Sequence, residues 1–334
     1  MLFYELNNNS RRVFIDTVQL YEAYRAAYKK NCSLFGGMHW KKSRGREYLF
    51  KSINRLGNGK SLGPRSQYTE KIISSFRSQK AQNKERLSSL SKKLNEQSKF
   101  CKAAMIQRVP VIVAKILRIL EKNNLLGKNY IVVGTNAIYA YEAAAGVFFD
   151  SSIISTNDVD ILWDTRRKLA IYTNPDIKQS GFIGLLKKVD KSFEILNPGD
   201  FRATNDNGFM VDIIKPMPKP VCKDEPLSPG GKNDLKAVEI AGLEWLISSP
   251  KFSQVVIGED GFPALLVAPD PRAFILHKLW LSTQIDRDAI KKSRDQKQAQ
   301  AVLKLINKYL PQYKINPLDL RMFPFEIINK FKLD

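Results

Sequence analysis

Two aspartates separated by a single residue, Asp158 and Asp160, open the apolar run 158–163. That run favours a β-strand, and residues two apart on a strand point to the same face of the sheet. Carboxylates this close repel each other unless a cation lies between them, and Mg²⁺ is commonly held by one or two carboxylates together with substrate phosphates. The pair predicts a metal site for phosphate chemistry, although so short a pattern also arises by chance. A second copy, Asp286 and Asp288, lies in a polar stretch typical of a helix or helix end, where residues two apart diverge.

A candidate phosphate-binding turn precedes the pair. Residues 130–133 are apolar and rich in β-branched side chains, which predicts a buried strand, and residues 137–145 are helical in composition. Gly134, Thr135 and Asn136 join the two and are candidates for binding a nucleotide. A strand, a Gly-Thr turn and a helix let the backbone approach a phosphate, with donors from the helix N-terminus and the Thr135 hydroxyl. The alternative is a glycine that ends the strand for steric reasons alone.

A third carboxylate follows the pair. Asn207-Gly208 between two apolar runs is a strong hairpin signal, and the second strand of that hairpin carries one acid, Asp212, among apolar residues. An isolated carboxylate in such a strand is costly unless it is paired or bound to a metal. The alternative is a position at the exposed edge of the sheet. Together, the glycine turn, the Asp-x-Asp strand and Asp212 form the kind of set that two-metal phosphoryl or nucleotidyl transfer requires.

These three pieces resemble the core signature of the DNA polymerase β-like nucleotidyltransferase superfamily. That signature is a strand, Gly-Gly or Gly-Ser, a helix, Asp-x-Asp or Asp-x-Glu, and a third acid on a neighbouring strand. Within the superfamily the chain looks most like an uncharacterised bacterial nucleotidyltransferase-like family. The wider likeness rests on residues 39–49, 60–66, 271–273, 277–280, 291–295 and 298–299. Thr135 replaces the usual Ser or second Gly, and the segment between Gly134 and Asp158 is longer than in compact members.

The resemblance implies a small mixed-sheet palm and Mg²⁺-dependent transfer of a nucleoside monophosphate from an NTP, such as ATP, to an acceptor hydroxyl. By this likeness Asp158 and Asp160 would hold two ions, for which Mn²⁺ is a substitute. Asp212 would help to hold the catalytic ion and act as, or beside, the general base. Gly134 and Thr135 would hold the triphosphate.

Cations for the phosphates are expected from the C-terminal helices. In related enzymes a helical domain after the palm often donates such cations, and Lys278, Arg287 and Lys291 have spacings that suit one shared side. Lys278 is the preferred candidate because apolar residues surround it. For any one of the three, a solvated charge on an amphipathic helix is the alternative.

A second source of cations lies near the N-terminus. Arg44 and Arg46 flank Gly45, and they lie between Trp40 and Tyr48. Basic residues interleaved with aromatics suit phosphate neutralisation beside stacked bases. The Arg-Gly-Arg segment is also flexible enough to fold over a triphosphate, and the sequence does not separate the two uses.

The positive charge of the chain is concentrated in its first third. Residues 1–124 hold 26 Lys and Arg against 8 Asp and Glu, a net of +18 out of +21 for the whole chain. So large and confined an excess points to a polyanionic partner, above all RNA. The alternative is a basic helical surface that serves solubility. With 43% hydrophobic residues the chain also has enough apolar material for a real core.

The cysteines and the apolar stretches indicate the cellular compartment in which the chain is expected to work. Cys32, Cys101 and Cys222 are widely spaced, which fits neither a zinc site nor a disulfide framework and indicates a reducing, cytoplasmic setting. The longest apolar stretch, 109–120, is interrupted by two basic residues and is too short to span a bilayer. The N-terminus lacks the pattern of a signal peptide. We therefore expect no membrane partner.

The expected fold class is α+β, with a small mixed-sheet palm between two mostly helical regions. The regions are a basic, mostly helical N-terminal part (1–124), the palm (125–216), and a Pro-rich linker, hairpin and helical C-terminal part (217–334). Helices are predicted at 12–35, 69–105 with Thr69 as its cap, 110–123, 243–248 and 271–309. Short strands are predicted within 36–65, and a hairpin at 258–261.

Two functions from different classes fit these observations. One is an active nucleotidyltransferase whose acceptor is RNA, including a tRNA end, or a protein side chain, with a toxin or defence role by analogy only. The other is a catalytically inactive palm that binds RNA or a partner protein. Three intact carboxylates favour the enzyme, because an inactive site has no physical need to keep them together.

Overall fold

The computed structural model describes residues 2–53, 58–167, 175–218, 227–231 and 233–331. They divide into two compact units, one of Met1–Arg11 with Ile106–Asp334 and one of Arg12–Met105. The first unit therefore holds both the predicted palm and the predicted C-terminal region. Pro220, Cys222 and Pro226 of the predicted linker lie outside the described residues. No helix in the described part of the chain combines the length and apolar composition needed to cross a membrane.

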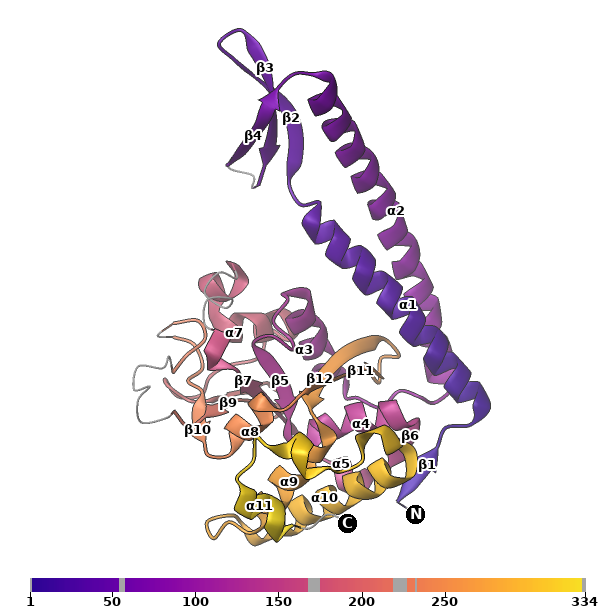
Figure 1. Ribbon diagram of the computed structural model, residues 1–334, viewed down its shortest axis with the longest axis vertical. Helices are drawn as coiled ribbons and strands as arrows, with labels where there is room; N and C mark the ends of the chain where they lie inside the picture. Colours follow the sequence, from indigo (N-terminus) through magenta and orange to yellow (C-terminus); the bar gives the residue numbers. More distant parts are fainter. Residues whose placement is uncertain (1, 54–57, 168–174, 219–226, 232, 332–334) are drawn as a thin grey trace. The chain divides into compact units, whose positions relative to one another are not determined.

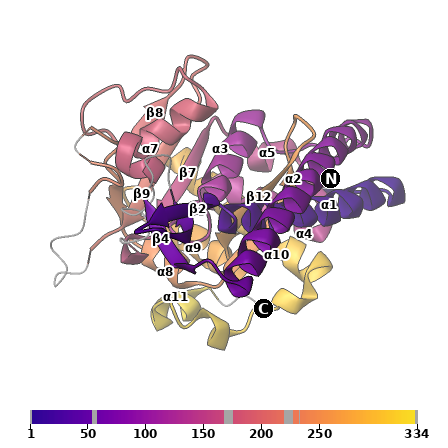
Figure 2. The same cartoon turned by 90° about the horizontal axis from the view of Figure 1, so that it is seen from above.

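A mixed sheet forms the centre of the first unit. Its strands run in the order β10 (Val238–Ile240), β9 (Met210–Pro216), β7 (Asp158–Trp163) and β5 (Tyr130–Val133), and β8 (Arg202–Thr204) pairs with β9. β7 is parallel to β9 and antiparallel to β5, and Figure 2 shows β7 and β9 side by side. All four residues of β5 are buried. The predicted buried strand at 130–133 and the predicted hairpin at Asn207-Gly208 are both confirmed.

Helices and a further hairpin surround this sheet. The remaining elements of the unit are β1 (Phe3–Glu5), α3 (Val111–Lys122), η1 (Gly134–Ala137), α4 (Ile138–Ala145), β6 (Val147–Phe149), α5 (Ser151–Ile154), η2 (Thr165–Arg167), α7 (Pro175–Val189), α8 (Leu243–Ser248), β11 (Lys251–Ile257), β12 (Pro263–Pro269), α9 (Pro271–Ser282), α10 (Ala289–Tyr309), η3 (Pro311–Tyr313), η4 (Pro317–Leu320) and α11 (Phe325–Lys330). β1 pairs with β6, and β11 pairs with β12, which lies against β5. The predicted helices at 110–123 and 243–248 and the hairpin at 258–261 are thus present.

The helix α10 brings polar residues into the interior. Its buried positions recur at helical spacing, and they include Asp295 and Gln298 as well as apolar residues such as Val302 and Leu305. α10 packs against α9 and also contacts α4 and α5. A polar residue at a core-facing position needs a partner, because burying a polar group without a hydrogen bond is costly.

The second unit consists of two long helices and a small sheet. α1 (Asn8–Ser33) begins in the first unit, and α2 (Gln67–Ala103) runs along it, as Figure 1 shows. Asn83 Nδ2 donates to the Ala27 carbonyl at 3.0 Å, so the two helices are joined by hydrogen bonding. In the sequence, the two helices are separated by β2 (Gly37–Ser43), β3 (Arg46–Ser52) and β4 (Gly59–Pro64), which form one antiparallel sheet.

The start of α2 differs from the prediction. Ser66, in an extended conformation, is the cap, and Thr69 lies at the third helical position rather than at the cap. The Thr69 N–H donates to the Ser66 hydroxyl oxygen, and the Ser66 N–H donates to the Thr69 hydroxyl oxygen. This reciprocal arrangement is a capping box, and either hydroxyl residue alone is a plausible cap by type.

Candidate active site

The glycine turn and the Asp-x-Asp pair meet in the structure. Gly134 follows β5 with a φ of +65°, a left-handed conformation that favours glycine. A Cβ atom at this position would lie 2.2 Å from Asp160 Oδ2. Glycine is therefore favoured at position 134 for two reasons: the backbone has a left-handed conformation, and the Asp160 carboxylate occupies the space that a Cβ atom would need.

Thr135 and Asn136 hold the turn in place. Both are buried in η1. The Thr135 hydroxyl oxygen accepts from Gln298 Nε2 at 3.1 Å, and Asn136 Nδ2 donates to the Asp158 carbonyl at 2.7 Å. Among the described residues, Asn136 Oδ1 and Gln298 Oε1 are buried without a hydrogen-bond partner. The turn thus connects the Asp-x-Asp strand to α10 and keeps two acceptors unused.

The three aspartates lie on adjacent parallel strands. Asp160 on β7 is directly opposite Asp212 on β9. The Thr156 hydroxyl donates to Asp158 Oδ1. Loss of hydration, followed by the charges of Asp158 and Asp212, raises the pKa of Asp160 to about 6, while the charges of Lys278 and Arg287 act in the opposite direction. Negative charge is therefore concentrated around Asp160.

Asp212 already has a strong partner. Arg202, opposite it on β8, donates from Nε to Asp212 Oδ1 at 2.7 Å and from Nη2 to Oδ2 at 2.6 Å. Asp212 is buried, so its predicted alternative position at an exposed edge is wrong. This two-pronged pair satisfies the buried carboxylate in the way that the apolar strand requires.

The described residues contain no group of three His, Cys, Asp or Glu side chains arranged to hold a metal ion. Asp158 and Asp160 offer the hard oxygen donors that Mg²⁺ takes. Asp212 offers the same donors, but both of its oxygens bind Arg202. The residues therefore fit a divalent ion at the Asp158–Asp160 pair, and they fit one that also uses Asp212 only after Arg202 moves.

Two cations that share one buried acid lie beside the carboxylates. Lys278 of α9 donates from Nζ to Asp295 Oδ1 at 2.6 Å, and Arg287 donates from Nε to Asp295 Oδ2 at 2.9 Å. Burial lowers the pKa of Lys278, and the charges of Asp295 and Asp160 act against that change. Two of the three predicted C-terminal cations, Lys278 and Arg287, thus share one buried acid.

The other predicted cations lie elsewhere. Lys291 is exposed on α10. Arg44 and Arg46 belong to the second unit, where Arg44 and Gly45 form the two-residue turn of the β2–β3 hairpin, both with positive φ. Gly134, Thr135, Asn136, the three aspartates and Lys278 all belong to the first unit.

A cavity of about 490 Å³ adjoins the turn through Gln298. Its lining includes Arg294, Lys297, Ser152 and Ser293. Two cations and two hydroxyl groups suit an anionic ligand.

Sequence reasoning assigned no role to Arg202, Asp295 or Gln298, although Asp295 and Gln298 lie in the segments on which the wider likeness rests. Asp295 and Gln298 carried a usable signal, because they occupy core-facing positions of an amphipathic helix that otherwise buries apolar residues. Arg202 carried none beyond its place in a hairpin.

Comparison with known proteins gives the family of the chain. A family model described as Nucleotidyltransferase matches residues 112–318, which is more than half of the chain and lies wholly in the first unit. No curated protein and no solved structure matches the chain.

Proposed function

The chain belongs to the nucleotidyltransferase family that this model describes, and we propose that it moves a nucleoside monophosphate from an NTP to an acceptor hydroxyl in a Mg²⁺-dependent reaction. One observation carries the proposal. Gly134 leaves room for the Asp160 carboxylate, and Asp160 lies opposite Asp212, so three separate sequence motifs converge on one carboxylate. We also propose that, among nucleotidyltransferases, the chain is most similar to an uncharacterised bacterial nucleotidyltransferase-like family.

Asp158 and Asp160 are the residues that would hold Mg²⁺ or Mn²⁺, and Asp212 would join them when Arg202 withdraws. A bound divalent ion supplies charge neutralisation at the phosphates and acidifies the acceptor hydroxyl. Burial raises the pKa of Asp160, and the charges of Asp158 and Asp212 raise it as well, so the negative charge gathered around this carboxylate supports a cation at this place.

The proposed transfer forms one bond and breaks one. The acceptor oxygen bonds to the α-phosphorus of the NTP. The bond between that phosphorus and the oxygen that bridges the α- and β-phosphates breaks, and pyrophosphate leaves. Asp212 accepts the proton of the acceptor hydroxyl, alone or beside a water molecule. The Gly134 backbone and the Thr135 hydroxyl bind the triphosphate, as does Asn136 through its unused oxygen by way of water.

Cations neutralise the charge of the pyrophosphate. Lys278 is held beside Asp160, which supports its assignment to this task. Arg294 and Lys297 of the adjoining cavity are further candidates. Arg44 and Arg46 are proposed for the same task or for binding the acceptor.

RNA, including a tRNA end, is the preferred acceptor, and a protein side chain is the second choice. The preference rests on the second unit, which carries 21 Lys and Arg against 6 Asp and Glu. A toxin or defence role is proposed by family analogy only.

The direct test is label transfer. The purified chain is incubated with each α-labelled NTP, Mg²⁺ and total RNA or protein, beside an Asp160→Asn variant. Asp286→Asn is the matched control, because it changes an exposed acid of the other Asp-x-Asp copy. We expect label in RNA from wild type and from the control but not from Asp160→Asn. Label in neither RNA nor protein, or equal label from all three proteins, contradicts the proposal.

One observation favours a second candidate, an inactive palm that binds RNA. Arg202 uses both oxygens of Asp212, the residue that would be the general base. If that pair is permanent, the site lacks a third carboxylate. The label-transfer test separates the two candidates, because only the enzyme produces labelled product.

A further inference from the structure

The sheet of the second unit has two faces of different chemistry. Successive side chains on a strand point to opposite faces, and the pairing of Trp40 with Leu49 fixes which residues share a face. Leu49 is fully buried, and Lys51, on its side of β3, lies 5.8 Å from the ring centre of Phe76 on α2. The face of Trp40 and Leu49 is therefore the one that packs on α2.

The opposite face presents aromatic rings among cations. It carries His39 and Lys41 from β2 and Arg46, Tyr48 and Phe50 from β3. The His39 and Phe50 ring centres are 5.6 Å apart, and Lys41 Nζ lies 5.3 Å from the Phe50 ring centre. His39, Lys41 and Arg46 are exposed, and Tyr48 and Phe50 are half-buried. We call these five residues the outer face.

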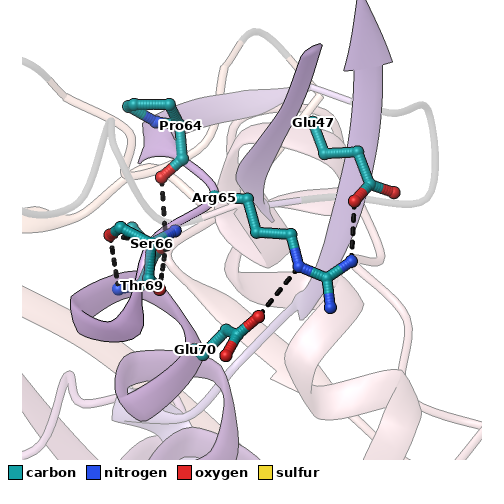
Figure 3. A network of polar contacts seen from close by, with 6 residues as sticks. All are labelled: Glu47, Pro64, Arg65, Ser66, Thr69 and Glu70. Atoms are coloured by element: carbon teal, nitrogen blue, oxygen red, sulfur yellow. Dashed lines mark hydrogen bonds and ion pairs between the residues drawn. The ribbon is translucent and has the colours of Figure 1, made fainter.

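Polar contacts connect the sheet that carries the outer face to α2. Figure 3 shows Arg65 between Glu47 of β3 and Glu70 of α2, with Arg65 Nη1 donating to Glu47 Oε2 at 2.6 Å and Arg65 Nε to Glu70 Oε1 at 2.9 Å. The Thr69 hydroxyl donates to the Pro64 carbonyl at 3.0 Å, which ties β4 to the first turn of α2. These contacts join the sheet to α2, so the strands that carry the outer face are attached to a long helix.

We propose that the outer face is a binding platform for single-stranded nucleic acid, with bases stacked on Phe50 and Tyr48 and phosphates neutralised by Lys41 and Arg46. Aromatic rings beside cations on an open sheet suit this ligand, because every base has a face that stacks and every nucleotide carries a phosphate. The charge of the unit, 21 basic against 6 acidic residues, is complementary to a polyanion. A duplex hides its base faces and suits this surface less.

This inference deepens the RNA-acceptor proposal, but binding does not depend on transfer. An Asp160→Asn chain is therefore expected to bind RNA as wild type does, so that loss of transfer and loss of binding are separable.

The test is fluorescence anisotropy of the full chain with a labelled, unstructured RNA oligomer, its DNA counterpart and an RNA duplex. Phe50→Leu keeps an apolar side chain but removes the ring, and we expect roughly tenfold weaker binding of the single strands. Phe100→Leu is the matched control, since Phe100 is an exposed aromatic residue at the other end of α2. We expect it to bind as wild type does, and thermal unfolding of both variants checks their folding.

A second pair tests the phosphate contacts. Lys41→Gln is compared with Lys99→Gln, which removes the same charge from an exposed site on α2. We expect Lys41→Gln alone to make the salt dependence of binding shallower. Equal affinity for RNA and DNA single strands, or a preference for RNA, supports the platform. The proposal is overturned if the duplex binds as tightly as the single strands, or if Phe50→Leu and Phe100→Leu bind the single strands with the same affinity. It is also overturned if Lys41→Gln and Lys99→Gln show the same salt dependence of binding.

Discussion

Arg202 is the residue whose removal tests the carboxylate site most directly. Its guanidinium donates to both oxygens of Asp212, and the Asp212 side chain is only 8% exposed whereas that of Arg202 is 39% exposed. Removing one partner of a fully buried pair costs about 3–5 kcal/mol, because the other charge is left unpaired. Since Arg202 is partly hydrated, we expect Arg202→Ala to lower the free energy of unfolding by about 2–3 kcal/mol.

The same change is expected to strengthen divalent-ion binding. Without Arg202, Asp212 is free to act with Asp158 and Asp160, and an ion that binds only the folded chain stabilises it by about 2.7 kcal/mol at a concentration 100 times its Kd. Urea unfolding of Arg202→Ala with and without Mg²⁺ measures both effects. We expect Mg²⁺ to restore most of the lost stability.

The matched control is Arg118→Ala. Arg118 also makes a two-pronged pair, with Asp260 at 2.7 and 2.9 Å, and Asp260 is not one of the three candidate metal ligands. Its removal is expected to destabilise the chain by a similar amount, and Mg²⁺ is expected to restore none of it. If Mg²⁺ leaves the unfolding of Arg202→Ala unchanged, or stabilises both variants equally, Asp212 is not part of a metal site and the reasoning fails.

Three further predictions concern single residues. Gly134→Ala is expected to abolish label transfer and to destabilise by more than Gly208→Ala in urea unfolding, because both have positive φ but only the first would bring a Cβ atom against a carboxylate. Gln298→Leu is expected to raise the KM for NTP at least severalfold, since it releases the Thr135 hydroxyl, and an unchanged KM would rule that link out. Burial lowers the pKa of His277 to about 3, below its ordinary 6.5, so the unfolded chain binds a proton that the folded chain does not. Stability is then expected to fall as pH drops from about 6.5 towards 3, by about 1.4 kcal/mol per pH unit from this group, and His277→Leu should remove that slope in unfolding measured across the range.

Much of the fold follows from local patterns. Residues 130–133 are apolar and β-branched, and Asn207-Gly208 is a turn signal, so the strand and the hairpin could be predicted from neighbouring residues alone. Gly134 could be predicted as a turn. That its missing Cβ makes room for Asp160 could not be predicted, because the contact joins two elements, η1 and β7, that are far apart in the sequence.

The Arg202–Asp212 pair depends on a hairpin register that the sequence does not reveal. A two-residue turn at Asn207-Gly208 would place Arg202 opposite Ile213. The loop spans 205–209 instead, with the Phe209 N–H donating to Asn205 Oδ1 at 2.8 Å, and this places Arg202 opposite Asp212. A shift of one residue turns every side chain of a strand to the other face. The partner of the third carboxylate was therefore decided by loop geometry.

The same alternation corrects the expected role of the aromatic residues near the N-terminus. Trp40 and Tyr48 are both flanked by basic residues in the sequence, yet they lie on opposite faces of the sheet. Trp40 stacks with Arg65, whose guanidinium carbon lies 5.1 Å from its ring centre, so it belongs to the face that α2 covers. Tyr48 shares its face with Phe50. The strand pairing, and not the composition, decides which ring is available to a base.

The two compact units divide the chemistry of the chain. The carboxylates, the glycine turn and the cations that bind Asp295 all lie in the first unit, together with the whole of the family match. Most of the excess positive charge and the outer face lie in the second. A carboxylate site gains from concentrated negative charge only when a cation enters it, whereas a nucleic-acid surface needs an uninterrupted positive field. Placing the two on separate cores lets each keep its own sign of charge, so changes in one unit are expected to alter transfer and changes in the other to alter affinity.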